Sequence, residues 1–516
     1  MHVPTVTSLD EIYPADALLA QAPRWDGLLE SFKAAFDGRK PDFVARSPGR
    51  VNLIGEHIDY SQYEVLPMAV TVDVLLAVAA RPDVPQQARI ANVEEAKFPR
   101  REFGFEKGIE IDSETLEWSN YFKCGLRVAT ELLRRKRGPE FVPVGLDVLV
   151  DGSVPSGGGL SSSAAFVCAS ALAAMRANGE REVDKKELVE LAIVSERAVG
   201  VQSGGMDQSA SVFGERGSAL YVSFKPTLQA TPVHFPSTDP ELVFVVAQSF
   251  VAADKHTSAP VHYNLRVVEC ALAAAFLAKI FRVGDLPSDS TPLGLSLRGF
   301  HDAYFEKHEG VKDNTTTPRP QFQAQLDVLL SLVDDYLTQE EGYTREQIAG
   351  VLGMSGEELT QCFFTKFPVR AERFMLRQRA QHVFAEAARV LKFRDLLEGS
   401  PAEGEGGGEA LLKKLGELMN ETQESCCVLY ECSCAELDEL CKLARGAGAY
   451  GSRLTGAGWG GCSVHLVPKD KVEKVREVWV ERYYRRKWPD ITEERLREAI
   501  VVSKPGSGSC VYEVEK

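Results

Sequence analysis

The sequence predicts an α+β fold with more than one domain. Segments with strand patterns and segments with helix patterns both occur, but they do not alternate regularly as in a doubly wound sheet. The chain has 516 residues, of which 44% are hydrophobic and 26% charged. This composition is typical of globular proteins, and the length is enough for about two to four domains. We place a boundary near residue 215, which gives an N-terminal domain of residues 1–215 and a C-terminal domain of residues 216–516.

The first part of the chain contains both element types. β-Branched and aliphatic residues dominate residues 65–78, and apolar residues alternate at Leu146, Val148 and Val150, as in strands. Small and apolar residues fill residues 161–175, with a serine at the start and Gly179 after the end, which predicts a helix. The expected elements are helices at 25–36, 161–175 and 185–199, and strands at 65–78 and 146–150.

The second part is richer in helices. The run E-G-E-G-G-G-E at Glu403–Glu409 has nothing to bury and predicts a mobile surface loop. The expected elements are helices at 264–281, 322–337 and 374–393, and strands at 220–222, 242–246, 462–467 and 500–502.

The net charge indicates which partners to exclude, and the cysteines indicate the cellular compartment. The chain carries 59 Lys and Arg against 74 Asp and Glu, a net charge of −15, which disfavours nucleic acid and anionic membranes as partners. No segment approaches the ~20 apolar residues of a membrane span, and Asp10 and Glu11 lie where a signal peptide needs an apolar core. The 11 cysteines show no zinc-type spacing, so we expect free thiols in a cytoplasmic protein.

A loop rich in glycine and serine is the most informative segment. It reads V-P-S-G-G-G-L-S-S-S-A-A at residues 154–165, between an expected strand and an expected helix. Glycines let the backbone approach a ligand, and serine hydroxyls beside the unpaired N–H groups of a first helical turn favour phosphate. The loop lacks the lysine of a P-loop, so charge neutralisation falls to Mg²⁺ and to residues from elsewhere. The alternative is a flexible turn capped by serine.

A second glycine motif, G-A-G-W-G-G at residues 456–461, matches G-x-G-x-x-G literally. A dinucleotide site needs this motif before a helix, whereas residues 462–467 read as a strand. We therefore expect a glycine-rich turn packed closely against another backbone or a ligand, and no NAD site.

Polar residues crowd into the segment S-P-G-R-V-N-L-I-G-E-H-I-D-Y, residues 47–60. Arg50, Glu56, His57 and Asp59 lie among apolar neighbours, as expected of a half-buried turn. Carboxylates and an imidazole in fixed positions suit the vicinal hydroxyls of a sugar. A metal site or a surface charge pattern is the alternative. Asp207, in S-G-G-M-D-Q-S-A-S, could cap a helix or act in a ligand cleft.

Several motifs in this order resemble the GHMP kinase superfamily and, more closely, its galactokinases of the larger eukaryotic, fungal-like type. The likeness covers most of residues 40–515, and the segments between about 283 and 400 look like eukaryotic insertions. The matching segments are residues 49–60 (G-R-V-N-L-I-G-E-H-I-D-Y), 118–125 (W-S-N-Y-F-K-C-G), 157–165 (G-G-G-L-S-S-S-A-A), 262–270 (H-Y-N-L-R-V-V-E-C) and 454–462 (L-T-G-A-G-W-G-G-C).

The resemblance implies a two-lobed GHMP kinase fold with the active site between the N- and C-terminal domains. It implies an enzyme that transfers a phosphoryl group from ATP to the C1 hydroxyl of galactose, the entry step of galactose catabolism, and that works as a monomer. A catalytic pair follows from the motifs. Asp207 would accept or orient the proton of the C1 hydroxyl, and Arg50 would hold Asp207 ionised and stabilise the transferred group.

The resemblance also assigns ligand contacts residue by residue. The sugar is expected to contact Glu56, His57, Asp59, Gly204 and Tyr263. The phosphates of ATP are expected at Gly157, Gly158, Gly159, Ser161 and Ser162, the adenine at Trp118, and Mg²⁺ at Ser163 and Glu196.

Two other functions remain open at this point. Some fungal relatives are galactose sensors that bind a transcriptional repressor and lack the Ser-Ala pair of the glycine–serine motif. Here Ser163 and Ala164 are present with Arg50 and Asp207, which favours an enzyme and leaves a second role with a repressor partner open. N-acetylgalactosamine kinase is the other alternative. Tyr263 before N-L-R-V-V-E, and S-A-S-V-F after Gln208, favour galactose.

Overall fold

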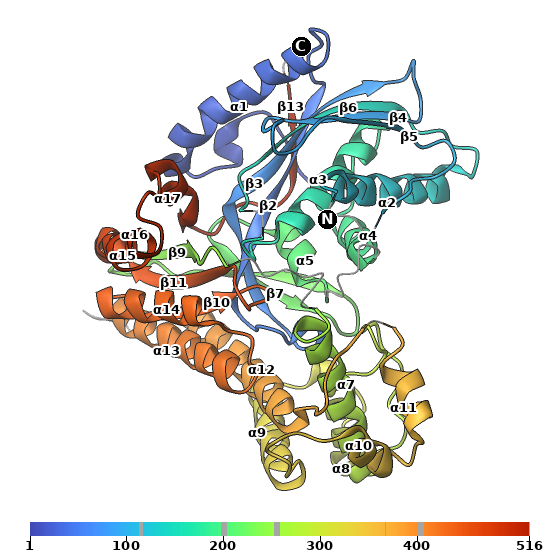
Figure 1. Cartoon of the computed structure of the whole chain (residues 1–516), viewed down its shortest axis with the longest axis vertical. Coiled ribbons are helices and arrows are strands. Elements are labelled where there is room, and N and C mark those ends of the chain that lie inside the picture. The colour runs from blue at the N-terminus through green and yellow to red at the C-terminus, as the bar shows by residue number, and fades with distance from the viewer. Residues whose placement is uncertain are drawn as a thin grey trace.

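The structure, a computed structural model, describes residues 1–112, 117–155, 157–197, 204–251, 259–366, 368–399 and 407–514. Two main β-sheets are covered by helices, and a helical extension lies below them in the view of Figure 1. The α+β prediction is confirmed. In the described part of the chain, no helix has the length and apolar character that a membrane crossing requires.

The N-terminal half is built on a seven-stranded sheet in the order β1-β13-β2-β3-β6-β4-β5. The long central pair, β2 and β3, is antiparallel, and irregularities at Pro48/Arg50 and Asn52/Ile54 interrupt its register. Such irregularities bend a strand and redirect its side chains. The strands are β1 (Thr5–Val6), β2 (Phe43–Ile54), β3 (Leu66–Arg81), β4 (Gln87–Asn92), β5 (Arg101–Gly104), β6 (Gly145–Gly152) and β13 (Cys510–Glu513).

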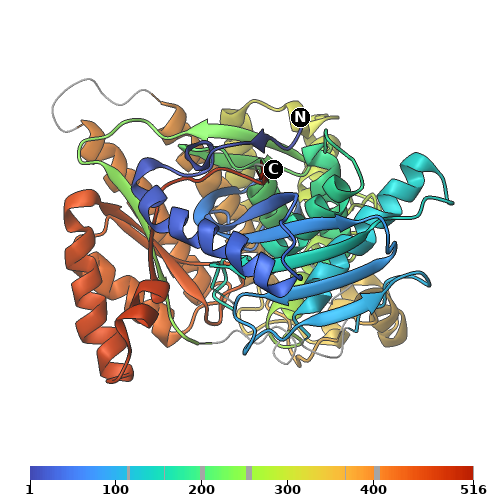
Figure 2. The same ribbon diagram turned by 90° about the horizontal axis from the view of Figure 1, so that it is seen from above.

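Both faces of this sheet are buried, and strand periodicity explains how. In β3, Leu75, Ala77 and Ala79 pack with helix α1 (Ala15–Ala35), whose Trp25 and Phe32 belong to the same cluster. The alternate β3 residues belong to the main core with α2 and α3. Figure 2 shows α1 lying across the sheet. The helices near the opposite face are α2 (Ser119–Arg137), α3 (Ser162–Ala177), α4 (Lys185–Arg197) and α5 (Met206–Phe213).

The second sheet has four strands in the order β10-β11-β9-β12, all antiparallel neighbours. Its inner residues Val243, Val245 and Ala247 form a separate core with Leu440 and Trp479. The strands are β9 (Leu242–Gln248), β10 (Gly451–Thr455), β11 (Cys462–Pro468) and β12 (Ile500–Ser503), and the helices are α13 (Gly407–Val428), α14 (Ala435–Ala447), α15 (Val472–Trp479), α16 (Arg485–Lys487) and α17 (Glu493–Ala499).

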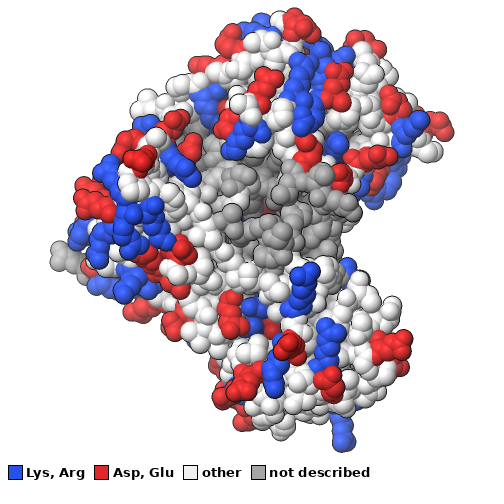
Figure 3. All heavy atoms as spheres, viewed as in Figure 1, with Lys and Arg blue, Asp and Glu red and all other residues white. Residues whose placement is uncertain are grey.

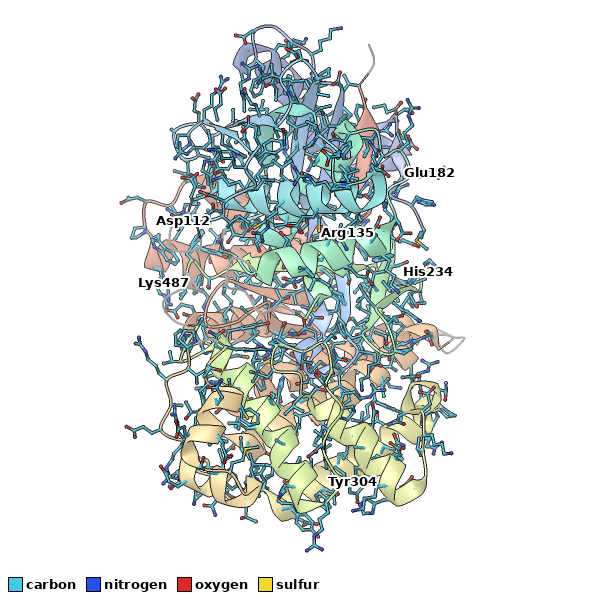
Figure 4. The ribbon with its side chains drawn as sticks, turned by 90° about the vertical axis from the view of Figure 1, so that its right-hand side faces the viewer. Asp112, Arg135, Glu182, His234, Tyr304 and Lys487 are labelled. Carbon is cyan, nitrogen blue, oxygen red and sulfur yellow. The ribbon has the colours of Figure 1, made fainter. Side chains whose placement is uncertain are left out.

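A helical extension, α7 to α12, lies between β9 and α13 in the chain, and the hairpin β7–β8 precedes β9. The extension contains the segments that the sequence marks as insertions, and Tyr304 on α8 lies at its outer end, far from the first sheet (Figure 4). The elements are β7 (Ser218–Ser223), β8 (Gln229–His234), α7 (Tyr263–Ile280), α8 (Leu297–Glu309), α9 (Arg319–Tyr336), α10 (Arg345–Leu352), α11 (Gly356–Phe363) and α12 (Leu376–Glu398). On the face in Figure 3, basic and acidic side chains are interspersed around the described surface.

The structure adds to one expectation about chain organisation and corrects another. The boundary near residue 215 stays a prediction, but the last strand, β13, returns to the first sheet and lies between β1 and β2, so the first and last strands of the chain pair with each other. For the expected loop at Glu403–Glu409, residues 403–406 lie outside the described residues. Residues 407–409 form the first turn of α13, so the loop prediction is wrong there, because α13 extends further toward its N-terminus than the glycines suggest.

Candidate active site

The glycine–serine loop connects β6 to α3. Gly157 and Gly159 have φ values of 70° and 74°, and Ser161 has a φ of 59°. Helix α3 begins at Ser162, one residue after the expected start, so the N–H groups of its first turn adjoin the loop. A Cβ atom on Gly159 would lie 2.9 Å from the carbonyl oxygen of Thr455. The glycines therefore allow a turn that is both left-handed and pressed against another segment.

That other segment is the second glycine motif, residues 456–461. A Cβ on Gly456 would lie 2.4 Å from the carbonyl oxygen of Gly159, and one on Gly461 would lie 3.1 Å from that of Gly158. Strand β11 follows at Cys462. The motif is thus the close-packed turn that the sequence predicts, and it supports the phosphate-type loop from the C-terminal half of the chain.

Asp207 lies next to this loop, at the second residue of α5. The Arg50 guanidinium donates to Asp207 Oδ1 through Nε at 2.8 Å, and Nη2 lies 2.7 Å from the same oxygen. Arg50 Nη1 also donates to the carbonyl oxygen of Gly159 at 2.6 Å. Ser161 Oγ donates to Asp207 Oδ2 at 2.5 Å. The predicted catalytic pair, Arg50 and Asp207, is therefore a close ion pair joined to the loop.

Three predicted sugar contacts, Gly204, Asp59 and Tyr263, lie in the neighbourhood of Asp207. A Cβ on Gly204 would lie 2.5 Å from Asp59 Oδ2, so this glycine leaves room for the carboxylate. Burial, and then the charge of Asp207, raise the pKa of Asp59. Burial, followed by the charges of Asp59 and Asp207, raises the pKa of Tyr263 well above its ordinary value. These electrostatic effects require the three ionisable groups to be close neighbours.

The other two predicted sugar contacts, Glu56 and His57, are engaged with the C-terminal half. The Glu56 carboxylate pairs with the Arg453 guanidinium and accepts the N–H of Gly456 at 3.2 Å. His57 Nε2 lies 3.1 Å from the carbonyl oxygen of Ala457, so this nitrogen carries the proton. The second glycine motif therefore anchors the sugar-signature turn as well as the glycine–serine loop.

Sequence reasoning missed the residues of α12 that hold this turn. Glu386 Oε1 accepts the N–H groups of Gly55 at 2.7 Å and of Glu56 at 3.0 Å, and His382 Nε2 donates to the Glu56 carbonyl at 2.9 Å. Burial alone would raise the pKa of Glu386, but Arg389 and Arg453 outweigh it and lower the pKa to about 2. Periodicity predicts α12 as a helix, but no local pattern marks Glu386 and His382 as site residues, because their partners lie more than 300 residues away in sequence.

Of the predicted adenine and metal residues, Ser163 belongs to the first turn of α3 and Trp118 contacts that helix. The Trp118 ring is stacked on Phe166 with centroids 6.2 Å apart and planes 6° apart, and its Nε1 donates to the Pro99 carbonyl oxygen at 3.2 Å. Ser162 and Ser163 are half-exposed in the first turn of α3. Glu196 belongs to α4, but its side chain lies outside the described residues. Trp118 thus contacts α3 at Phe166, three residues after Ser163.

The cysteines are all described, and all 11 are free thiols, as expected. Cys426, Cys432 and Cys441 are fully buried. Among the described residues, no group of three or more Cys, His, Asp or Glu side chains could hold a metal ion.

Comparisons with known proteins identify the family. Residues 30–80 match the galactokinase galactose-binding signature, residues 120–215 the N-terminal domain of GHMP kinases and residues 409–485 their C-terminal domain. Galactokinase of Saccharomyces cerevisiae is 43% identical over 509 residues, covering 96% of this chain and 95% of the yeast protein. Galactokinase of Schizosaccharomyces pombe is 42% identical over 500 residues, covering 95% of each chain.

A solved structure agrees in fold. Lactococcus lactis galactokinase complexed with galactose superposes with a TM-score of 0.65 at 24% identity, covering 95% of this chain and all of that one. The two-lobed GHMP kinase fold expected from the motifs is thereby confirmed. Because fungal galactokinases align with this chain over almost its whole length, the chain belongs to the galactokinase family of GHMP kinases.

Proposed function

We propose that this protein is an ATP-dependent galactokinase, which converts α-D-galactose to galactose 1-phosphate. The observation that carries this proposal is the Asp207 carboxylate, held by Arg50 beside the glycine–serine loop and next to Asp59 and Tyr263. A carboxylate between a sugar-signature turn and a phosphate-type loop is the arrangement that transfer between a hydroxyl and a nucleotide needs.

The reaction follows from this arrangement. The C1 oxygen of galactose attacks the γ-phosphorus of ATP, the bond from that phosphorus to the β,γ-bridging oxygen breaks, and ADP leaves. Asp207 receives or orients the proton of the C1 hydroxyl. Arg50 keeps a positive charge beside Asp207 and beside the loop, where negative charge gathers during phosphoryl transfer.

The sugar contacts divide into two kinds. Asp59 and Tyr263, together with the backbone at Gly204, are proposed to contact galactose hydroxyl groups. Glu56 and His57 are proposed to line the sugar while their other polar atoms fix the turn, since both already bond to residues 453–457. A carboxylate keeps free acceptor positions even when one oxygen is paired, so both roles are compatible for Glu56.

The nucleotide is proposed to lie along the glycine–serine loop, with its phosphates at Gly157, Gly158, Gly159, Ser161 and Ser162 and its adenine at Trp118. The stacked pair Trp118 and Phe166 provides an aromatic surface beside the first turn of α3. N–H groups at a helix start favour phosphate through both hydrogen bonding and the helix dipole.

A magnesium ion is proposed at Ser163 and Glu196. The half-exposed Ser163 hydroxyl is a hard oxygen donor of the kind Mg²⁺ prefers, and the loop supplies no lysine to neutralise the phosphates. The bound ion would supply charge neutralisation for the β- and γ-phosphates.

An assay of ADP release with MgATP tests the function. Galactose, N-acetylgalactosamine and glucose are compared as acceptors at equal concentrations. Fast turnover with galactose alone is expected. Preference for the acetamido sugar would assign the chain to N-acetylgalactosamine kinases, and no turnover, with galactose and ATP still raising the melting temperature, would assign it to the sensors.

We further propose a cytosolic monomer whose partners are its substrates. The free state of all 11 cysteines supports a reducing compartment. A second role with a transcriptional repressor would show as complex formation dependent on both galactose and ATP. Size-exclusion chromatography with light scattering checks the monomer.

A further inference from the structure

Ser161 occupies an unusual backbone position. Its φ and ψ of 59° and 46° are left-handed, although it carries a Cβ, and it immediately precedes α3. Gly157 and Gly159, earlier in the same loop, adopt similar φ values without strain. A glycine would suit the conformation of residue 161 better than serine, and non-glycine residues in this region are concentrated at functional sites. The hydroxyl of Ser161 therefore needs an explanation other than the turn.

The hydroxyl contacts the reacting carboxylate. Ser161 Oγ donates to Asp207 Oδ2 at 2.5 Å, and the residue is 8% exposed. The other carboxylate oxygen, Oδ1, receives Arg50. A carboxyl group held at one oxygen can turn about its Cβ–Cγ bond, whose torsion has broad minima. When Arg50 holds one oxygen and Ser161 holds the other, the plane of the Asp207 carboxylate is fixed.

The loop and Asp207 are also joined through Arg50. The backbone N–H of Arg50 donates to the Leu160 carbonyl oxygen at 3.0 Å, and its side chain donates to the Gly159 carbonyl oxygen at 2.6 Å. Arg50 thus binds residues 159–160 as well as Asp207. Because Ser161 also binds Asp207, two separate hydrogen-bonded links connect the glycine–serine loop to this carboxylate.

We propose that Ser161 is a positioning residue for Asp207: its hydroxyl sets the plane of the carboxylate toward the C1 hydroxyl of the sugar. This inference rests on the proposed galactokinase function and changes the expected role of one loop serine. Ser162 and Ser163, half-exposed in the first turn of α3, are left for the phosphates and the magnesium ion.

The test compares Ser161→Ala with Ser162→Ala in the full-length protein. Loss of a hydrogen bond to a charged group corresponds to a fall in kcat of about 10- to 100-fold for Ser161→Ala. The KM values for ATP and galactose should change by less than about threefold, because the interaction lies within the enzyme. Ser162→Ala should instead raise the KM for ATP. A Ser161→Ala enzyme with normal kcat and a raised KM for ATP would overturn the proposal.

Ser161→Gly distinguishes the effect of losing the hydroxyl from the effect of the left-handed backbone. Glycine relieves the left-handed strain, so this variant should melt at or above the temperature of Ser161→Ala. If the hydroxyl matters, both variants lose kcat to the same extent. If Ser161→Gly retains normal kcat, the loss in Ser161→Ala comes from the backbone and the proposal is wrong.

The pH dependence of kcat gives a readout that a purely structural role would not move. A hydroxyl that donates to the carboxylate favours its charged form, so the acidic limb should move to higher pH in Ser161→Ala. Among the described residues, the ionisable groups beside this carboxylate include Arg50 on β2, Asp59 and Tyr263, and they are the same in both enzymes. An unchanged acidic limb would contradict a role through Asp207.

Asp207→Asn distinguishes the failure of this inference from the failure of the proposed function. If Ser161 acts through Asp207, adding Ser161→Ala to Asp207→Asn should leave the residual kcat unchanged. An additive loss would refute the positioning role while leaving the kinase assignment intact. A wild-type protein that does not turn over galactose would refute the function itself.

Discussion

Two clusters of opposite charges flank the sugar-signature segment, and they differ in what their charges face. In the first, the side chain of Asp207 is 18% exposed beside that of Arg50 at 5%. In the second, Arg453 and Glu56 are 0% and 3% exposed, and Glu386 is 0% exposed beside Arg389. The first keeps part of a carboxylate accessible to a substrate. In the second cluster, the carboxylate oxygens accept hydrogen bonds from backbone N–H groups and from arginines.

The difference teaches how a polar residue in a motif should be interpreted. Both clusters contain residues expected to touch ligands, and both bring distant segments together. A buried ion pair adds little net stability, but removal of one partner leaves an uncompensated charge. The second cluster therefore acts chiefly on the geometry of the turn at residues 55–59, whereas the first is placed to act on the substrate.

The largest effect is expected for Asp207→Ala in the exposed cluster. Loss of the proton acceptor should reduce kcat by about 10²- to 10⁴-fold. The melting temperature should fall, because Arg50, whose side chain is 5% exposed, loses its charged partner, but the folded state should persist, since the Asp207 side chain is not part of the core. ADP release and thermal unfolding measure the two quantities. Near-normal kcat would remove Asp207 from the mechanism.

Glu386→Ala breaks the buried cluster and should mainly affect stability. Arg389 and the N–H groups of Gly55 and Glu56 would lose their acceptor, at a cost of about 3–5 kcal/mol in the free energy of unfolding. The KM for galactose should rise through the loosened turn. Glu386→Gln is the matched control, because its amide oxygen still accepts both N–H groups. Urea unfolding that shows equal stability in both variants would contradict the holding role.

Gly204→Ala tests the spacing around Asp59. The added Cβ would lie 2.5 Å from Asp59 Oδ2, so the carboxylate must move. Overpacking costs about 1–3 kcal/mol, and if this cost falls on galactose binding it raises the KM for galactose roughly 5- to 100-fold. The KM for ATP should change less. Gly350→Ala, where nothing lies within 4 Å of the new atom, is the control. A change confined to the KM for ATP would place Asp59 outside the sugar site.

The smallest effect concerns His382 in the buried cluster. Burial lowers the pKa of His382 to about 3, so the folded protein keeps it neutral while the unfolded chain binds a proton below about pH 6.5. Acidification by one unit, from pH 6.5 to 5.5, should therefore cost up to about 1.4 kcal/mol of stability from this residue. His382→Gln should have a shallower pH dependence of unfolding than His2→Gln, an exposed control. Equal slopes would contradict the prediction.

Much of the fold was predictable because local patterns carry it. The strand at β3, the long helices α7, α9 and α12, and the start of α3 follow from periodicity and from serine and glycine at the ends. The beginning of α13 was not, because glycines at residues 407–408 suggest a loop and tertiary packing overrides that preference.

The site was predictable only as a set of motifs. The resemblance of residues 47–60, 157–165 and 454–462 to one family names the candidate residues. It does not show that Glu56 pairs with Arg453, or that Glu386 and His382 hold the turn, since these contacts join segments with no shared local pattern.

The sequence by itself determined the α+β class, the family resemblance and the candidate residues, because short motifs and periodicity are local properties of the chain. Only the tertiary structure decided how the serines and carboxylates divide their roles. Ser161 lies against Asp207, and Glu56 lies against Arg453, because β2, α3, α5 and β10 converge from distant parts of the chain. Burial and the nearest charge, which determine whether a side chain can meet a substrate, exist only after that convergence.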